Sequence, residues 1–338
     1  MMNYKDVLKE AKGNLNKSCR VCPICNGVAC SGEVPGMGGK GTGDAFKINI
    51  EALDAFKLNM RTIHDAKNPD TSIELFGRKM DIPVFAAPVS GTTLNMGGKF
   101  SEEEYISWVI GGCLSGGIFP MVGDTAVDSF FTTNLSELEK HGGDGIAIIK
   151  PWENVKVIEK IKLAEKAGAF AIGMDIDACG LITLALFGKP VMPKTVEEIK
   201  EIVESTNLPF ILKGIMTPDE AKLAVDAGVA AIVVSNHGGR VLDQTPGVAD
   251  VLQDIAEVVK GKVIILADGG VRSGADILKM LALGADAVLI GRPFVTASFG
   301  GKTEGVKSYI DYLKGDLKSA MVLTGCNSIK SIDKRILY

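Results

Sequence analysis

The sequence has only three histidines and no long apolar run, and both features limit the classes of function that the protein can have. No run of about 20 residues lacks a charge or a glycine, so we expect no membrane span. The formal net charge of -4 offers no general electrostatic case for nucleic-acid binding. Because the first residues open a polar helix rather than a signal peptide, we expect a cytoplasmic location.

After about residue 80, short apolar runs alternate with amphipathic helical stretches. Eight runs are rich in Val, Ile, Ala or Phe with little alternation, which is typical of parallel strands covered on both faces. Eight strands with helices between them predict an α/β fold, the (β/α)8 TIM barrel. An open doubly wound sheet is the alternative, but we see no sign of its topological switch point. The runs lie at 84–90, 118–123, 145–150, 170–177, 209–215, 231–237, 263–270 and 287–293.

Residues 1–45 stand apart from this alternation, so we divide the chain into an N-terminal extension, 1–45, and a barrel, 46–338. The extension holds four of the seven cysteines in the spacing C-x2-C-x2-C-x4-C. In a cytosolic chain this crowding suggests metal or redox use more than disulfides. An iron–sulfur cluster, a zinc site and a set of free thiols are all open. The cysteines are Cys19, Cys22, Cys25 and Cys30.

One histidine lies where a buried strand is expected to end. The heptapeptide SNHGGRV follows the apolar run 230–234, and its two glycines separate His237 from Arg240. Histidine can take a proton near neutral pH, and arginine can hold a carboxylate with two parallel hydrogen bonds. The pattern predicts a site that binds an acid and removes a proton from it. A histidine satisfied within its own loop is the ordinary alternative.

Glycine and arginine also follow the last two predicted strands. In (β/α)8 barrels, functional groups sit at the carboxyl ends of strands, and the loops after strands seven and eight commonly bind phosphate. The seventh strand ends with Asp268, Gly270 and Arg272, and the eighth with Gly291 and Arg292. Two Gly/Arg pairs on adjacent strand ends favour a bound phosphate over ordinary turns.

Lys213 follows three apolar residues, so we expect its stem to be buried and to need an anionic partner. The ammonium could form a structural salt bridge, or it could stabilise negative charge on a cofactor ring. Asp175 and Asp177 project to the same side of the fourth strand. Asp177 is the better candidate to orient His237. Either aspartate could also neutralise Lys213 or Arg240.

Together these residues resemble the FMN-dependent α-hydroxy acid oxidases and dehydrogenases, which include glycolate oxidase and lactate oxidase. The resemblance covers roughly 45–338 and is clearest in PVFAAPVSG, LPFILKGIMTPDEA, VVSNHGGRVLDQTPG and ILADGGVRSGADILKM. It implies bound FMN and oxidation of a small 2-hydroxy acid to the 2-oxo acid. His237 would abstract the proton while hydride equivalents pass to flavin N5. By family analogy we expect a homo-oligomer, a tetramer or octamer.

The resemblance also implies a role for each candidate residue. His237 matches the active-site base, Arg240 the carboxylate-binding arginine and Asp177 the partner of the histidine. Lys213 matches the lysine that faces the flavin. The remaining matches are to cofactor-binding positions: Pro88, Val89, Ser90, Ser235, Asp268, Gly270, Arg272, Gly291 and Arg292.

The substrate side departs from the family, so the sequence does not select a particular 2-hydroxy acid. Where the family has a substrate tyrosine after the third strand, this chain offers Ile149 or Lys150. Asp175 stands where the family has a flavin-contacting threonine, and the loop after the fourth strand is shorter. The electron acceptor, oxygen or a carrier, is also open. A metal cluster at the cysteines would fit a carrier.

Two other functions remain open for such a chain. One is an FMN-dependent non-redox isomerase similar to type 2 isopentenyl diphosphate isomerase. Arg240 argues against it, because a grip on a carboxylate is of no use for an allylic diphosphate. The other is a flavin-binding protein without catalytic activity, which the joint presence of His237, Arg240 and Lys213 disfavours.

Overall fold

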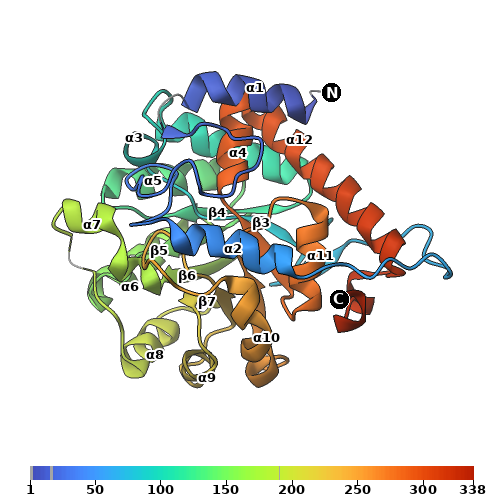
Figure 1. Cartoon of the computed structure of the whole chain (residues 1–338). Coiled ribbons are helices and arrows are strands. Elements are labelled where there is room, and N and C mark those ends of the chain that lie inside the picture. The colour runs from blue at the N-terminus through green and yellow to red at the C-terminus, as the bar shows by residue number, and fades with distance from the viewer. Residues whose placement is uncertain (1–2, 16–17, 190) are drawn as a thin grey trace.

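The computed structural model describes residues 3–15, 18–189 and 191–338 (Figure 1). Eight parallel strands close into a barrel, in the spatial order β10-β3-β4-β5-β6-β7-β8-β9. The predicted (β/α)8 barrel is therefore confirmed, and the open sheet is wrong. The strands are β3 (Val84–Ala86), β4 (Phe119–Gly123), β5 (Ile146–Ile149), β6 (Ala171–Asp175), β7 (Phe210–Ile215), β8 (Ala231–Val234), β9 (Ile264–Ala267) and β10 (Ala287–Ile290).

The barrel strands are apolar along their length because packed side chains fill the inside and helices cover the outside. Every residue of β5 and of β8 is buried, for example. Several strands end sooner than expected, as β8 does at Val234, where residues 235–237 leave the hydrogen-bonded ladder. The polar residues singled out in the sequence therefore lie mainly in loops at the carboxyl ends of the strands.

Helices alternate with the strands and surround the barrel (Figure 1). Four of them begin at hydroxyl caps that satisfy the first free N–H groups; for example, the hydroxyl of Ser101 accepts from Glu104 N–H, and that of Thr195 from Glu198 N–H. The surrounding helices are α4 (Glu102–Ser115), α5 (Asp128–Lys140), α6 (Asn154–Lys166), α8 (Val196–Glu204), α9 (Pro218–Asp226), α10 (Val248–Val259), α11 (Gly274–Ala282) and α12 (Arg292–Thr324).

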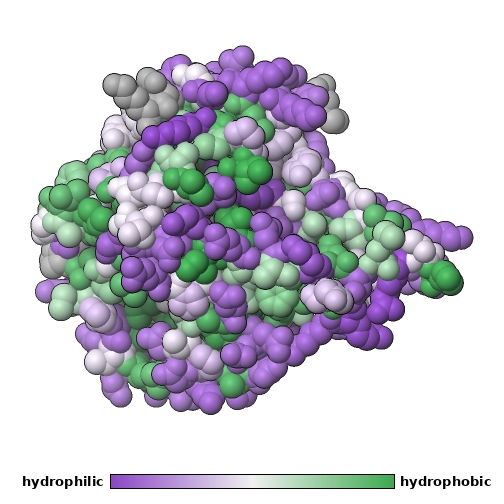
Figure 2. All heavy atoms as spheres, in the orientation of Figure 1, coloured by the Kyte–Doolittle hydropathy of each residue, from purple (hydrophilic) through white to green (hydrophobic). Residues whose placement is uncertain are grey.

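Shorter elements complete the described chain. A hairpin of β1 (Ile73–Leu75) and β2 (Arg78–Met80) precedes the barrel, and the segment before it projects at the right of Figure 1. Figure 2 shows hydrophobic residues at the tip of this projection, and the exposed residues of the segment before β1 include Met60 and Ile63. None of the helices in the described residues has the length and apolar character needed to cross a membrane. The other elements are α2 (Asp44–Ala55), α3 (Thr92–Asn95), α7 (Ile182–Leu186) and the 3₁₀ turns Ile176–Gly180, Ile329–Ser331 and Lys334–Ile336.

The first helix, α1 (Tyr4–Leu15), packs along α12 at the top of Figure 1. Its apolar face buries Val7, Ala11 and Leu15. The two backbones approach so closely that a Cβ atom built on Gly300 would lie 2.0 Å from the carbonyl oxygen of Val7. The start of the N-terminal extension is thus packed on the barrel's last helix.

This packing predicts that Leu15→Ala destabilises the barrel as a whole. Removing a buried leucine side chain costs about 2–5 kcal/mol of unfolding free energy, because it leaves a cavity. Leu163→Ala on α6 is the matched control, because that leucine is 44% exposed. Thermal and urea unfolding should show a clear loss for Leu15→Ala alone. Equal unfolding curves for the two variants would mean that the barrel is stable without α1.

Candidate active site

The carboxyl ends of the strands surround a pocket with an empty volume of about 1100 Å³, including the part open to solvent. Asp177 and Ser235 do not line it but contact residues that do. The structure thus brings the predicted residues of the barrel together at one end. The predicted residues in the lining are Pro88, Val89, Ser90, Lys213, His237, Arg240, Asp268, Gly270, Arg272, Gly291 and Arg292.

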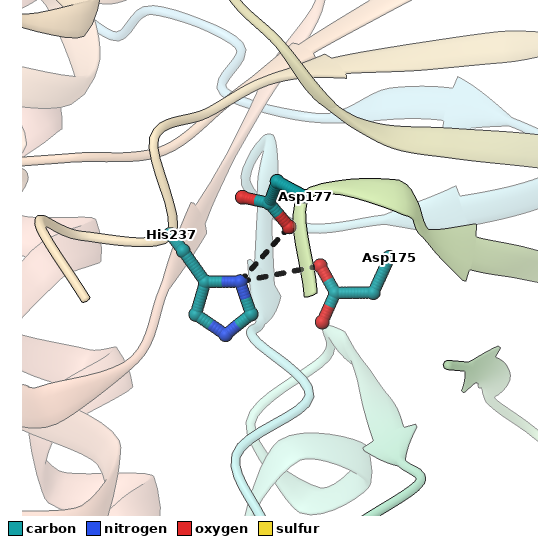
Figure 3. A group of neighbouring side chains, drawn as sticks. All are labelled: Asp175, Asp177 and His237. Carbon is teal, nitrogen blue, oxygen red and sulfur yellow. Dashed lines mark hydrogen bonds and ion pairs between the residues drawn. The ribbon is translucent and has the colours of Figure 1, made fainter. Parts of the chain in front are cut away.

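His237 is held by carboxylates on one side of its ring (Figure 3). Its Nδ1 lies 3.0 Å from Oδ1 of Asp177 and 3.4 Å from Oδ1 of Asp175. The other ring nitrogen, Nε2, points away from both carboxylates (Figure 3). A hydrogen bond at Nδ1 fixes which nitrogen can accept a further proton, so Nε2 is the basic atom of this site.

The backbone after β8 sets the position of this ring. His237 has a left-handed backbone with φ of 57°, and its N–H donates to the hydroxyl of Ser235 at 3.0 Å. The same hydroxyl donates to Oδ2 of Asp268 at 2.9 Å. A non-glycine residue with positive φ is uncommon and persists where its surroundings hold it. Ser235 therefore acts as an anchor for the histidine rather than as a lining residue.

Asp175 lies between two lysines on neighbouring strands. Its Oδ2 is 2.6 Å from Nζ of Lys150, and its Oδ1 is 3.2 Å from Nζ of Lys213. Burial alone would raise the pKa of Asp175, but the charges of His237, Lys150 and Lys213 outweigh it and hold the pKa well below its usual range. Asp175 is therefore a carboxylate at neutral pH.

Asp177 has the opposite shift. Burial raises the pKa of Asp177, although the charges of His237 and Lys213 act against this. Its Oδ2 is buried and has no hydrogen-bond partner among the described residues. The carboxylate of Asp177 thus depends on His237, and it is stabilised most when the imidazole carries a proton.

Lys213 is buried, as expected, and it has several partners. Its Nζ lies 3.0 Å from the hydroxyl of Ser235 and 3.6 Å from Oδ2 of Asp268, in addition to Asp175. Burial would lower the pKa of Lys213, but Asp175, Asp177 and Asp268 raise it above its usual value. The ammonium is permanently charged, and it both forms salt bridges and faces the pocket.

Arg240 is partly buried, and no carboxylate of the described residues lies within salt-bridge distance of it. Its guanidinium donates to the carbonyl oxygens of Gly36 and Gly38 and to Oδ1 of Asn95, the last at 2.9 Å. Burial and the nearby charge of Arg292 lower the pKa of Arg240 to about 9. Since a guanidinium stays protonated in proteins, the shift measures how poorly this cation is compensated. The site therefore suits an anionic ligand.

The same is true of Arg292, which follows β10 and shares the carbonyl oxygen of Gly38 with Arg240. Arg292 donates to the carbonyl oxygens of Met37, Gly38 and Gly238 at 2.7 to 3.0 Å, and burial lowers its pKa to about 10. Its guanidinium stacks 3.7 Å above the ring of Phe46. A stacked, partly buried arginine without an acidic partner is typical of phosphate recognition.

Further polar side-chain atoms near Arg292 also lack hydrogen-bond partners. The Nε of Arg272 and Oδ1 of Asp268 are buried without a hydrogen-bond partner in the described part of the chain. Gly269 and Gly270 have φ of 87° and 90°, and the loop lies so close to α2 that a Cβ on Gly270 would meet the carbonyl oxygen of Asn49 at 2.5 Å. An orphaned N–H beside bare glycine backbone suits an anionic group such as a phosphate.

Ser90 lines the pocket, but its hydroxyl points into the protein. It donates to a carboxylate oxygen of Glu102 and accepts from Nδ2 of Asn134 at 3.0 Å. Glu102 also accepts the N–H groups of Gly91 and Thr92. The side chain of Ser90 thus fixes the loop after β3, and only its backbone is left for a ligand.

Two features of the site were missed by sequence reasoning. The first is Lys150, which was noted only as a replacement for a tyrosine. It follows a buried strand just as Lys213 does, so the same signal was present. The second is the segment 36–38, whose carbonyl groups cover Arg240 and Arg292. Contacts between residues about 200 positions apart leave no mark in a local pattern.

The four cysteines of the extension are free and partly buried. Among the described residues, no three thiols lie close enough together to hold one ion. Burial raises the pKa of Cys19 and of Cys30, which disfavours the thiolate form that binds metals. Cys25 lies nearest to the pocket, with its carbonyl oxygen and Sγ at 3.4 and 3.6 Å from Arg272.

One group of side chains in the described residues is compact enough for an ion: Asp175, Asp177 and His237. Two lysine ammonium groups, those of Lys150 and Lys213, already lie against Asp175. Positive charge at this distance repels a cation. The arrangement suits proton transfer better than metal binding.

Comparison with known proteins agrees with this geometry. The family model for FMN-dependent dehydrogenase matches residues 36–185 and 181–338. The 4-hydroxymandelate oxidase of Amycolatopsis orientalis is 30% identical over 336 residues, which cover 86% of this chain and 89% of that protein. The 2-hydroxyacid oxidase 1 of Homo sapiens is 31% identical over 333 residues, with 86% and 87% covered.

Solved structures give the same result. The crystal structure of mandelate oxidase with (S)-2-phenylpropionate has a TM-score of 0.79 at 28% identity, and the match covers 100% of this chain and 98% of that one. Because the family model and both relatives span most of the sequence, the chain belongs to the FMN-dependent dehydrogenases, flavin oxidoreductases that act on the CH–OH group of 2-hydroxy acids.

Proposed function

We propose that this pocket holds FMN and a small 2-hydroxy acid at the same time, and that His237 and Arg240 act on the acid. The observation that carries the proposal is the partly buried guanidinium of Arg240, which has no carboxylate partner among the described residues and lies beside a histidine oriented by Asp177. When bound, FMN supplies the two-electron redox chemistry. The protein's own residues bind and orient the acid and move its proton.

Arg240 grips the carboxylate of the substrate with charge-assisted hydrogen bonds. His237 takes a proton at Nε2, either from the hydroxyl group or from the α-carbon. The imidazolium that results is stabilised by Asp177, 3.0 Å from Nδ1. This arrangement is the general-base pattern in which a carboxylate orients a histidine and balances its charge.

The cofactor would be held at both ends by residues of the pocket. Arg272, Arg292 and the backbone at Gly270 would bind its phosphate, because they are basic or bare and lack acidic partners. Gly291 would allow close approach there. At the other end Lys213 would lie against the ring, where its permanent charge stabilises negative charge on the reduced form.

The rival functions fit this site less well. The non-redox isomerase is not favoured, because the matching family model is a dehydrogenase and the similar proteins are oxidases of 2-hydroxy acids. A protein without catalytic activity has no need for a histidine in a left-handed backbone with its Nδ1 held by Asp177. Both arguments favour oxidation of a 2-hydroxy acid.

We keep the metal site at Cys19, Cys22, Cys25 and Cys30 as a separate proposal that rests on the spacing of these residues alone, because their thiols do not converge on one point in the described part of the chain. An iron–sulfur cluster there would fit electron transfer to a carrier, whereas zinc would be structural. Iron and zinc analysis of anaerobically purified protein tests it, and absence of both metals would remove it.

We also propose a cytoplasmic location and assembly into a homo-oligomer, a tetramer or octamer. The exposed apolar residues Met60 and Ile63 support self-association, because exposed apolar residues that cluster often mark contact surfaces. Light scattering of the purified protein measures its mass directly.

The base assignment predicts that His237→Ala binds FMN but loses turnover. Loss of a general base typically lowers the rate by about 10²–10⁴-fold. The measurement is bleaching of the flavin band after anaerobic mixing with 2-hydroxy acids, and the flavin content of each sample gives cofactor binding. His141→Ala is the control, since His141 ends α5 away from the pocket lining. Near-normal reduction of the His237→Ala variant by the true substrate would refute the assignment.

The phosphate assignment predicts that Arg272→Gln weakens binding of FMN but not of riboflavin. The two ligands differ only in the phosphate group, so their affinity ratio isolates that contact. Loss of a charge-assisted contact to phosphate costs about 1.5–3 kcal/mol, or roughly 10- to 100-fold in affinity. Quenching of flavin fluorescence during titration of the apoprotein measures both constants. A proportional loss for both flavins would place the phosphate elsewhere.

A further inference from the structure

Lys150 is a buried cation in the pocket lining for which the proposed chemistry has no role. The side chain is 9% exposed, and it directly follows β5, all four residues of which are buried. Its backbone N–H is bonded to Oδ2 of Asp124 at 3.2 Å, which fixes the start of the side chain. The lysine is therefore held in place, with its ammonium group at the pocket.

The strand register brings Lys150, Asp175 and Lys213 into one row across the barrel. Asp175 is the last residue of β6 and lies opposite Lys213 of β7. On the other side Ile149 of β5 lies opposite Met174, so the next residues, Lys150 and Asp175, are neighbours. The row is thus a built feature of three consecutive strands rather than a chance surface contact.

The two oxygens of Asp175 are divided between the two lysines. Oδ2 pairs with Lys150 at 2.6 Å, while Oδ1 is 3.2 Å from Lys213 and 3.4 Å from Nδ1 of His237. If Lys150 were uncharged, the full negative charge of the Asp175 carboxylate would act on Lys213 and His237. Lys150 therefore controls how much of the positive charge of Lys213 is available to a ligand and how much is offset by Asp175.

The balance of charges around His237 shows why the charge of Lys150 matters to a bound ligand. Two ammonium groups, Lys150 and Lys213, face three carboxylates, Asp175, Asp177 and Asp268. The carboxylates exceed the ammonium groups by one while His237 is neutral, and loss of Lys150 would double this excess. A net negative wall opposes both an anionic substrate and an anionic reduced flavin.

The ammonium of Lys150 also has donors to spare. An ammonium group has three N–H bonds, and among the described residues Nζ has one hydrogen-bond partner, Asp175. The remaining donors of a buried group in the lining need acceptors. The carbonyl oxygens of a flavin ring are acceptors of the required kind.

We propose that Lys150 is a positioning residue for the bound flavin: it neutralises Asp175, so that the charge of Lys213 stays available to stabilise negative charge on the flavin ring. The inference rests on the FMN site proposed above and adds a specific role for a residue that the site had left unexplained. It makes the reduction potential of bound FMN depend on a residue that is not needed for proton transfer.

The test compares Lys150→Gln with wild type, both loaded with FMN. We expect the midpoint potential of the bound flavin to fall and the affinity for sulfite to fall by about tenfold or more, because one positive charge is lost near the ring. Sulfite is a suitable probe because its addition to the flavin leaves negative charge on the ring. Neither measurement requires turnover.

The matched control is Lys160→Gln. Lys160 is a buried lysine on α6 whose Nζ pairs with Asp124 and Asp128, each at 3.0 Å, and it does not line the pocket. This control loses the same charge at similar burial, so it reproduces any loss of stability. We expect its flavin potential and sulfite affinity to equal those of wild type.

A double variant, Lys150→Gln with Asp175→Asn, separates a charge effect from a folding defect. Removing both partners leaves no unpaired carboxylate, so we expect it to recover most of the lost sulfite affinity. Wild-type potential and sulfite affinity in Lys150→Gln would overturn the inference, as would an equal change in Lys160→Gln. Failure of wild type itself to bind FMN would instead overturn the proposed function.

Discussion

The partly buried guanidinium groups of Arg240 and Arg292 constrain the whole site, because no carboxylate of the described residues neutralises them. A charge removed from water is costly unless it is paired and hydrogen-bonded. Here backbone carbonyl groups of the segment 36–38 and of Gly238 supply only part of the compensation. The fold thus holds partly uncompensated positive charge that a bound anion can neutralise. This is the physical basis for reading the pocket as a site for a carboxylate and a phosphate.

On the side of the pocket formed by the ends of β5, β6 and β7, the charged side chains are paired with one another. There Lys150 after β5 and Lys213 of β7 both pair with Asp175 of β6, and the serine after β8 links them to His237. Charges that are paired in this way change little when a ligand enters. One wall therefore binds anions while the other holds a proton acceptor in a fixed state. The closed barrel brings the two walls together because all its strands end at the same rim.

Much of this could be predicted from the sequence. Eight apolar runs indicated the barrel, since parallel strands covered on both faces are apolar throughout. Polar residues directly after those runs indicated the site, because strand ends meet at one rim, and His237, Lys213 and Arg272 were found in this way. The same rule would have selected Lys150, but it was compared only with the tyrosine of related proteins.

Other features could not be predicted from a local pattern. The cover that residues 36–38 form over Arg240 depends on contacts between distant parts of the chain. The inward hydroxyl of Ser90 depends on Glu102 and Asn134, which come from two different helices. The cysteine spacing suggested a metal site, yet spacing alone does not determine whether thiols converge. In each case the deciding information lies in three-dimensional packing.

The most direct test of the account is the affinity of the FMN-loaded protein for a 2-oxo acid, measured by the change that binding causes in the flavin spectrum. The account predicts that Arg240→Lys keeps its flavin but binds the acid about 10²-fold more weakly, because a lysine cannot form the two parallel hydrogen bonds of a guanidinium. Equal affinity in wild type and in this variant would contradict it, since the guanidinium of Arg240 would then not be the site of the carboxylate.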